Sequence, residues 1–591
     1  MDSRRTPLTT ASAPASAPAF RSLPEYVRHW AGTTPDRRAF TFVEHPAPDS
    51  RGVHRTLTWR RLDLRIRAVA ARLAAEAEPG ARVALLCPQG TEYVTAFLAA
   101  LAAGLVAVPL YPPGLPGHGD RLSAVLADAR PAVVVTTGRA LEEVREFCAD
   151  RSLPVVAADQ VPDAAAHDGP PGTPDGTAVA YLQYTSGSTR LPAGVEITHA
   201  NVVANARQAL TAYGADTRPV TCVGWLPLYH DMGLVLSVAA PVVRGLLSAL
   251  MDPVAFLHEP VRWLRLLAAH PRAVSAAPNF AYDYCAQTVT EAQKAGLRLD
   301  GITALINGSE PVRPGTADRF HTAFAAQGLV PDTHCPSYGL AEATVFVSAA
   351  RPGEPLRRFA LDRDALATGK ALPARPDDPT AVLLAGCGTP AGQRVRIADP
   401  VSRAALGEGE VGEIWVRGPN VGRGYRNQDR YSRQVFGATF ADTGSDPGGW
   451  LRTGDLGTVL DGQLIVTGRL KDLIVVDGRN HYPQDVEATA QEAHPAVRRD
   501  RLAAFGIPGA SGERVVVVAE HARNTALDAI DVPALVREVR AAVSNRHGLR
   551  LADVVLVPPG TVPRTSSGKV SRALTRERYL AGAYASPEAA E

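Results

Sequence analysis

Residues 178–198 read AVAYLQYTSGSTRLPAGVEIT, and this stretch decides the fold expected for the whole chain. The apolar run Ala178–Gln183 predicts a buried strand, and Val195–Thr198 predicts a second strand after a Pro-Ala-Gly turn. Residues 185–190 between them are hydroxyl residues, one glycine and Arg190. Backbone N–H groups and hydroxyls in such a hairpin can wrap a phosphate chain, although an isolated run of this kind is more often a polar turn. It is not a Walker A loop, because the lysine of that motif is missing.

Apolar strand-like runs alternate with helical patterns on both sides of this stretch. Predicted strands include Arg82–Cys87 and Ala132–Thr136, and predicted helices include Arg60–Glu78 and Val261–His270. Alternation of this kind predicts an α/β architecture with parallel-rich sheets. The most apolar window, Ala96–Leu110, is too short to cross a bilayer and predicts a buried helix leading to a buried strand.

The chain is too long for one hydrophobic core, so two or more domains are expected. Short strand candidates at 394–397, 413–417, 457–460 and 464–467 predict a small β-barrel-like subdomain. Strands and helices then mix in a separate α+β unit. The expected parts are a disordered leader at 1–20, a large N-terminal domain at 21–470, a small C-terminal domain at 471–582 and a disordered tail at 583–591.

Composition excludes several classes of function. A formal net charge of +2 gives no reason to expect a nucleic-acid-binding surface or a polybasic membrane surface. The six cysteines form no CxxC pair or Cys/His cluster, which predicts free thiols, a cytoplasmic location and no zinc site. Of 62 basic residues only four are lysines, so a lysine here is less often a generic surface charge: Lys294, Lys370, Lys471 and Lys569.

Six further motifs follow in chain order. They are WLPLYHDMG at 225–233, NGSEP at 307–311, SYGLAEAT at 337–344, TGD at 453–455, GRLKD at 468–472 and PRTSSGK at 563–569. Taken alone, each has an ordinary explanation: His230 is a packed histidine, Tyr338 a buried tyrosine, and Glu342 a first-turn glutamate favoured by the helix dipole. The alternative is that Tyr338 stacks on a base and Glu342 holds Mg²⁺.

The ordered set, spread over about residues 20–580, resembles the adenylate-forming enzymes: acyl-CoA synthetases, luciferases and peptide-synthetase adenylation domains. The resemblance implies ATP and Mg²⁺ as cofactors, and a large adenylation domain followed by a mobile small domain. The chain departs from the family's frequent T-G-x-P-K-G pattern, because Arg190 replaces the glycine and Ala193 the lysine. The essential cation is therefore expected from Lys569.

The same resemblance implies roles for individual residues. Lys569, His230 and Glu342 are the implied catalytic residues, Glu342 and Thr185 the implied metal ligands, and Lys471 the implied hinge between the two domains. The residues implied in nucleotide binding are Thr185, Ser186, Gly187, Ser188, Thr189, Arg190, Gly308, Ser309, Glu310, Pro311, Ser337, Tyr338, Gly339, Thr344, Asp455 and Arg469. The residues expected to line the substrate pocket are Trp225, Met232, Gly233, Pro278, Asn279 and Phe280.

Within the superfamily, the chain resembles the fatty acyl-AMP ligases, which pass an acyl group to an acyl carrier protein of a polyketide or peptide synthetase. The residues that carry this resemblance are LQ at 182–183, AVPLYPPG at 107–114, WLPLYHDMGL at 225–234, APNFAYD at 277–283 and GRNHYPQDVE at 478–487. Residues 351–380 resemble the insertion of this branch. Phe359, Leu361 and Leu366 are expected to anchor it on the large domain and hinder the rotation that CoA requires. A plain surface loop is the alternative.

Three other functions are weighed. An amino-acid adenylation domain usually carries an Asp in an F-D-x-S context, whereas residues 231–236 read DMGLVL and suit an alkyl chain, with about 0.8 kcal/mol from each buried CH₂. An acyl-CoA synthetase would use free CoA as the acceptor. A non-catalytic relative would bind acyl-adenylate only, and the intact His230, Glu342, Asp455 and Lys569 count against it.

Overall fold

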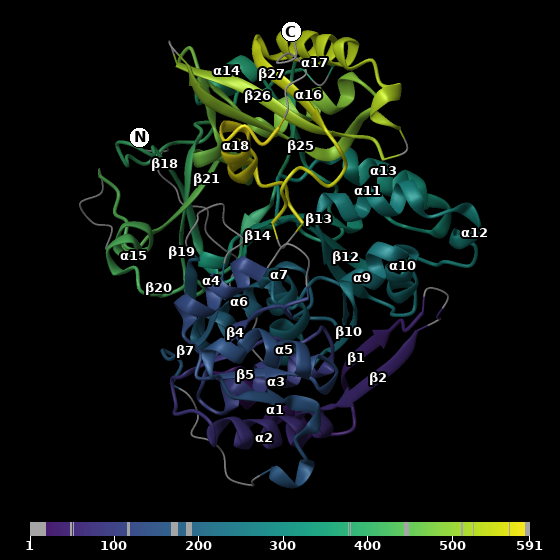
Figure 1. The fold of residues 1–591 in the computed structure, drawn as a ribbon, viewed down its shortest axis with the longest axis vertical. Helices are drawn as coiled ribbons and strands as arrows, with labels where there is room; N and C mark the ends of the chain where they lie inside the picture. Colours follow the sequence, from purple (N-terminus) through teal and green to yellow (C-terminus); the bar gives the residue numbers. More distant parts are fainter. Residues whose placement is uncertain are drawn as a thin grey trace.

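The computed structural model describes residues 19–584, except 48–49, 51, 115–118, 167–174, 185–191, 376, 379, 442–447, 510–511, 524 and 566–567. Residues up to 470 are named here the large domain and residues from 471 the small domain, whose yellow-green elements gather at the top of Figure 1. The phosphate-loop candidates at 185–190 lie outside the described residues. Most of the expected leader and tail also lie outside them.

The opening stretch forms two strands of a sheet with seven described strands, ordered β20-β8-β7-β4-β3-β5-β6. β7 and β8 pair antiparallel with Tyr184 opposite Gly194, so the predicted hairpin is confirmed. The strands are β3 (Arg82–Leu85), β4 (Val106–Pro109), β5 (Val133–Thr136), β6 (Val155–Ala157), β7 (Val179–Tyr184), β8 (Gly194–Thr198) and β20 (Gly424–Tyr425). β3 is parallel to β4 and to β5, as the alternation predicted.

A second sheet has nine described strands in the order β17-β14-β13-β12-β11-β9-β10-β1-β2. Its strands are β1 (Arg38–Glu44), β2 (Val53–Thr58), β9 (Thr221–Gly224), β10 (Leu247–Met251), β11 (Ala273–Ala277), β12 (Ile302–Asn307), β13 (His334–Gly339), β14 (Phe346–Ala349) and β17 (Thr389–Pro390). The neighbours from β13 through β1 pair in parallel, which brings the carboxyl ends of β12 and β13 to one edge.

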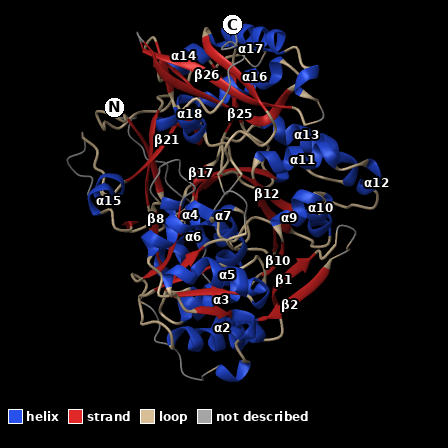
Figure 2. Ribbon diagram, in the orientation of Figure 1, coloured by secondary structure: helices blue, strands red, loops and turns tan. Residues whose placement is uncertain are grey.

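Helices pack on both faces of the seven-stranded sheet (Figure 2). Val83 and Leu85 of β3 face the main core, whereas Ala84 and Leu86 face a second core with α4 and α5, because successive strand residues point to opposite faces. The helices of the large domain are α1 (Leu23–Thr33), α2 (Trp59–Ala74), α3 (Thr91–Ala102), α4 (Gly119–Ala129), α5 (Leu141–Cys148), α6 (His199–Ala212), α7 (Asp231–Leu234), α8 (Ala240–Arg244), α9 (Pro253–His258), α10 (Val261–Ala268), α11 (Asn279–Thr288), α12 (Glu291–Lys294), α13 (Pro314–Phe324), α14 (Arg363–Ala367) and α15 (Asp429–Phe436).

Beyond residue 350 the large domain is β-rich, as predicted. A four-stranded antiparallel sheet is ordered β18-β19-β21-β22, and a separate pair joins β15 to β16. The strands are β15 (Arg358–Leu361), β16 (Val382–Ala385), β18 (Arg394–Ala398), β19 (Gly412–Arg417), β21 (Leu451–Leu460) and β22 (Gln463–Arg469). The predicted barrel-like subdomain is, among the described strands, an open sheet, because its edge strands β18 and β22 do not pair with each other.

The small domain mixes strands and helices, as expected of an α+β unit. Its elements are β23 (Ile474–Val476), β24 (Arg479–His481), α16 (Pro483–Ala493), β25 (Val497–Gly509), β26 (Gly512–His521), α17 (Val532–His547), β27 (Leu551–Val557) and α18 (Arg572–Leu580). Val486, Val517 and Val539 belong to its own hydrophobic core. Within the described residues, no helix is both long and apolar enough to cross a membrane. All six cysteines are described, and each is a buried free thiol.

Candidate active site

Two predicted nucleotide motifs lie at the carboxyl ends of adjacent parallel strands. Residues 308–311 follow β12, and Ser337–Gly339 end β13, with Asn307 opposite Pro336. A Cβ at Gly308 would lie 2.7 Å from the Ser337 carbonyl oxygen, so only glycine permits this approach of the two loops. Ligands of open α/β sheets bind at this edge.

Two residues with left-handed backbone lie at the same edge. Ser309 has φ +74° and Thr344 has φ +69°, which is unusual for residues other than glycine and most unusual for β-branched threonine. Thr344 is fully buried, and its hydroxyl donates to the Asn420 carbonyl oxygen at 2.7 Å. Such strain is found mainly at functional sites, where the surrounding structure holds it in place.

Asp455 and Arg469 lie opposite each other in the β21–β22 ladder. The Arg469 guanidinium is 3.0 Å from one Asp455 carboxylate oxygen, and the Tyr338 hydroxyl donates to the other at 2.9 Å. Residues from three motifs therefore meet at one buried carboxylate, although Tyr338 is 117 positions from Asp455. A carboxylate beside a cation and a hydroxyl is suited to bind a ribose diol.

Lys569 reaches this site from the small domain. Burial lowers the pKa of its ammonium, helped by Arg469, whereas Glu310, Asp231 and Asp455 oppose the shift. Burial raises the pKa of Glu310, and Arg313 and Lys569 oppose this rise. The predicted catalytic lysine is thus held among carboxylates of the large domain, in the motifs at 225–233, 307–311 and 453–455.

His230 directly precedes the short helix α7, and its Nδ1 lies 2.7 Å from the Asp231 carboxylate. Burial alone would raise the pKa of Asp231, but His230 and Lys569 outweigh burial and leave this pKa below its usual value. The carboxylate therefore stays ionised and holds the Nδ1–H of the ring. Nε2 is the nitrogen that remains for a ligand.

Glu342 lies in a 3₁₀ turn, Ala341–Ala343, rather than in the first turn of an α-helix. The Tyr425 hydroxyl donates to one of its carboxylate oxygens at 2.7 Å, and burial raises the pKa of the carboxyl. Mg²⁺ is commonly held by one or two carboxylates together with substrate phosphates. Glu342 fits that role, since a cation would offset the cost of burying its charge.

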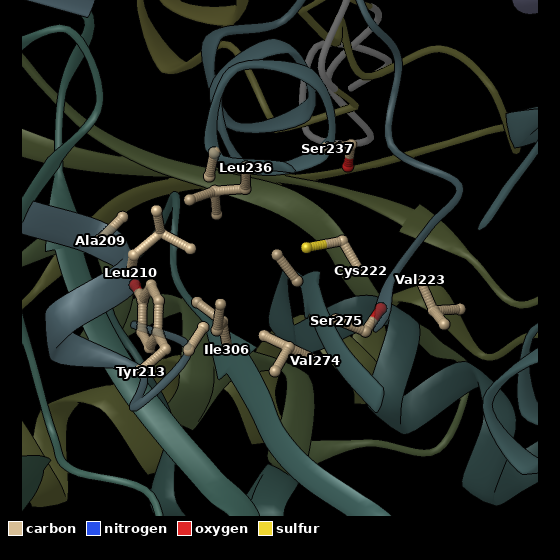
Figure 3. A pocket seen from close by; sticks show the side chains of 13 residues that line it. Ala209, Leu210, Tyr213, Cys222, Val223, Leu236, Ser237, Val274, Ser275 and Ile306 are labelled. Atoms are coloured by element: carbon tan, nitrogen blue, oxygen red, sulfur yellow. The ribbon is translucent and has the colours of Figure 1, made fainter. Parts of the chain in front are cut away.

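An apolar cavity of about 30 Å³ lies between α6, β9, β11, β12 and the segment after α7. In Figure 3 the side chains of Leu210, Leu236 and Ile306 converge on it. The residues that line it are Ala209, Leu210, Tyr213, Ala215, Cys222, Val223, Leu236, Ser237, Ala240, Val274, Ser275, Ala276 and Ile306. Val235–Ala239 are π-helical, a conformation often found at functional sites.

None of the six predicted pocket residues lines this cavity. Trp225 stacks on Phe256 with ring centroids 3.9 Å apart, and Phe280 meets Trp225 edge-on. Asn279 supports the 307–311 loop: its backbone N–H donates to Glu310 at 2.9 Å, and its side chain donates to the Pro311 carbonyl oxygen. Met232 lies four residues before Leu236, and its Sδ accepts a hydrogen bond from the Ser309 hydroxyl at 3.7 Å.

Residues 351–380 contact both domains. Leu361 and Leu366 share a hydrophobic cluster with Leu456 of the large domain and Tyr482 of the small domain. Arg363 donates to His547 Nδ1 at 3.1 Å and lies 3.6 Å from Asp485, both in the small domain. The segment is thus not a plain surface loop. Lys471 lies in a 3₁₀ turn, Leu470–Asp472, where the two named domains join.

Sequence reasoning did not find Tyr425, Tyr213 or Arg313. Tyr425 reaches Glu342 because β20 pairs with β8, and Tyr213 lines the cavity from the end of α6. None of the three belongs to a motif with a recognisable spacing. Only its position two residues after the NGSEP motif at 307–311 could have drawn attention to Arg313.

Comparisons with known proteins identify the family of this chain. A family model described as AMP-binding enzyme matches residues 27–426. A second model, the AMP domain of Disco-interacting protein 2-like proteins, matches residues 471–588. The first match covers more than half of the chain, and the second begins at the residue expected to be the hinge.

Individual relatives are similar over almost their whole length. The long-chain-fatty-acid–AMP ligase FadD26 of Mycobacterium marinum is 42% identical over 95% of this chain and 97% of the relative. FadD21 of Mycobacterium tuberculosis, provisionally named a fatty-acid–CoA ligase, is 41% identical over 94% of this chain and 98% of its own.

Solved structures include a fatty acyl-adenylate ligase from a study of the E. coli and L. pneumophila enzymes. It has a TM-score of 0.85 and 33% identity, and the match covers 97% of this chain and 99% of that chain. The L. pneumophila ligase in complex with acyl adenylate and pyrophosphate has a TM-score of 0.74, also at 33% identity, with coverage of 96% and 98%. This chain therefore belongs to the AMP-binding enzymes and, within them, to the fatty-acid–AMP ligases.

Proposed function

We propose that this chain uses ATP and Mg²⁺ to convert a fatty acid into its acyl-adenylate, with release of pyrophosphate, and then passes the acyl group to the phosphopantetheine thiol of an acyl carrier protein. The observation that carries the proposal is the position of Lys569. A lysine of the small domain lies among Asp231, Glu310 and Asp455 of the large domain. An apolar cavity of about 30 Å³ also lies in the large domain, and an alkyl chain would enter it if the side chains that line it moved.

In the first step, a carboxylate oxygen of the acid attacks the α-phosphorus of ATP. The new O–P bond forms as the bond to the β-phosphate oxygen breaks, and pyrophosphate leaves. Lys569 stabilises the negative charge that builds on the phosphorus oxygens. Burial and Arg469 lower the pKa of its ammonium, and the carboxylates of Glu310, Asp231 and Asp455 oppose this shift.

The other residues bind and orient the reactants. Tyr338 and the loop at 308–311 frame the base, and Asp455 with Arg469 binds the ribose hydroxyls. Asp231 holds His230 so that Nε2 faces the reacting carboxylate. Glu342 would hold Mg²⁺, which when bound neutralises charge on the phosphates. Buried apolar walls exclude water from the mixed anhydride, which would otherwise be hydrolysed.

In the second step, the carrier thiol attacks the acyl carbonyl carbon. A C–S bond forms, the C–O bond to AMP breaks, and the thiol proton is released. The small domain must first move about Lys471 to remove Lys569 and admit the thiol. The contacts of residues 351–380 with both domains support a restraint on that motion, which favours a carrier protein over free CoA.

One incubation tests the proposal. The protein, Mg·ATP and a ladder of fatty acids are mixed, and the mixture is divided between free CoA and a holo carrier protein. Mass spectrometry then follows acyl-AMP, acyl-CoA and acyl-carrier thioester. We expect acyl-AMP that persists with CoA and is consumed by the carrier. Rapid acyl-CoA formation would instead identify an acyl-CoA synthetase, and no acyl-AMP with any acid would identify a non-catalytic relative.

A further inference from the structure

We propose that Arg313 of the large domain and Asp500 of the small domain form a positioning pair that holds Lys569 over the adenylation site. The Arg313 guanidinium donates to the Asp500 carboxylate at 2.6 Å. Figure 1 shows β25, which carries Asp500, next to α13, which begins directly after Arg313. The inference rests on the adenylation activity proposed above.

On the large-domain side, hydrogen bonds connect the pair to the loop at 308–311. Arg313 follows Pro311 by two residues, and its backbone N–H donates to the Asn279 side-chain oxygen at 3.2 Å. The backbone N–H of Asn279 in turn donates to Glu310. The same asparagine therefore fixes both Glu310 and Arg313. Arg313 is therefore connected through Asn279 to the loop at 308–311, which we propose frames the nucleotide.

On the small-domain side, Asp500 has a left-handed backbone with φ +56°. It lies where the β25–β26 register shifts between Val497 and Leu502, and its N–H donates to the Gln491 side chain at 3.0 Å. Glycine adopts this conformation without strain, whereas a residue with a side chain does so at a cost. The ion pair between the Asp500 carboxylate and Arg313 accounts for an aspartate at this position.

Two points of the small domain thus meet one loop of the large domain. Asp500 binds Arg313, and the Lys569 ammonium lies in the field of Glu310, three residues earlier. Because Asp500 and Lys569 both belong to the small domain, we expect the ion pair to restrain the position of Lys569. Rotation of the small domain for the thiol step would break both contacts. The pair should therefore assist the first half-reaction and not the second.

The test compares the half-reactions in single variants and in their combination. Asp500→Asn and Arg313→Gln should each slow acyl-AMP formation about fivefold, the scale of a half-buried ion pair, with the KM for ATP unchanged. The double variant should be no slower than either single variant, because each removes the same interaction. Acyl transfer from purified acyl-AMP to the carrier thiol should keep its parental rate. Asp364→Asn, which removes the exposed interdomain pair with Arg479, is the matched control and should keep parental acyl-AMP formation.

Asp500→Gly separates the ion pair from folding. Glycine relieves the strained backbone, so this variant should melt at a higher temperature than the parent and yet form acyl-AMP more slowly. Parental acyl-AMP formation by Asp500→Gly would overturn the inference, as would losses that multiply in the double variant or fall equally on both half-reactions. A parent chain that makes no acyl-AMP would instead overturn the proposed function itself.

Discussion

The neighbours of Lys569 influence the pKa of its ammonium in opposite directions. Burial and Arg469 lower the pKa of its ammonium, and three carboxylates from separate motifs oppose them. The effect of a buried cation on a phosphoryl transfer is large because few water molecules screen it. In a chain with only four lysines, its position at this site is the residue-scale feature from which the chemistry follows.

Replacement of this lysine should remove most of the chemistry and little of the binding. Lys569→Ala should lower the rate of acyl-AMP formation by about 10²–10³, the usual effect of losing one electrostatic donor. Pyrophosphate release in a single turnover measures it. Lys370→Ala, at an exposed lysine, is the control and should keep the parental rate. Acyl-AMP formation at the parental rate in Lys569→Ala would contradict the assigned role.

At the scale of elements, the π-helical segment after α7 and the end of α6 build the cavity. Leu236 comes from the former and Tyr213 from the latter, where the Tyr213 hydroxyl lies 2.7 Å from the Ser337 hydroxyl. A cavity of 30 Å³ holds little more than a water molecule, so an alkyl chain enters only if these side chains move. Their sizes should therefore set the preferred chain length.

Cavity residues should change that preference in opposite directions. Leu236→Ala removes three carbons and should move the optimum to acids longer by about two or three methylenes, each worth about 0.8 kcal/mol. Ala240→Leu narrows the same cavity and should move the optimum to shorter acids. The measurement is kcat/KM for acyl-AMP formation across a ladder of fatty acids. An unchanged profile in both variants would exclude this cavity as the alkyl site.

The contact between residues 351–380 and α17 depends on a neutral histidine. Arg363 can only donate, so His547 Nδ1 accepts, and Nε2–H donates to the Thr489 hydroxyl at 2.7 Å. Burial lowers the pKa of His547 to about 3, and the cationic or titratable neighbours that add to the shift are Arg363, Arg546 and His481. A protonated ring would face the Arg363 guanidinium, so acid should weaken this contact.

The sign of the pH effect follows from linkage. Below the ordinary histidine pKa of about 6.5, the unfolded chain binds a proton that folded His547 does not, so stability falls as the pH drops toward 3. His547→Gln removes this titration. The loss of unfolding free energy between about pH 7.5 and pH 5 should be smaller in the variant by about 2 kcal/mol. Denaturant unfolding at the two pH values measures it, and equal losses in parent and variant would contradict it.

At the scale of the whole molecule, two bodies share one site. Lys569 and Asp500 come from the small domain, and their partners come from the large domain. Residues 351–380 add a second set of contacts between the same bodies. Motion between the bodies is therefore opposed on two sides, and the backbone near Lys471 is where the proposed rotation must occur.

A rigid hinge should separate the two half-reactions. Lys471→Pro fixes φ within the 3₁₀ turn and should slow thioester formation by at least about tenfold more than acyl-AMP formation. Lys471→Ala keeps the backbone free and is the control for loss of the side chain. Acyl-AMP formation and acyl transfer to the carrier are timed separately. Equal losses in both steps would count against Lys471 as the hinge.

Much of the fold could be predicted because its signals are local. Hydrophobic periodicity predicted β7, β8 and α10, since strands and helices repeat over a few residues. The open four-stranded sheet was wrongly expected to be barrel-like, because closure depends on how edge strands meet. The predicted pocket residues do not line the apolar cavity: Trp225 stacks on Phe256, and Phe280 meets Trp225 edge-on.

The sequence by itself determined the alternation of strands and helices, the order of the motifs and the scarcity of lysine, all of which are local or countable. Only the tertiary structure decided which side chains meet. Tyr338 reaches Asp455, Tyr425 reaches Glu342, and Arg313 reaches Asp500 across 187 positions. These contacts depend on strand order and domain packing, which no short spacing encodes. The physical reason is that local hydrogen bonding selects elements, whereas burial of their surfaces selects partners.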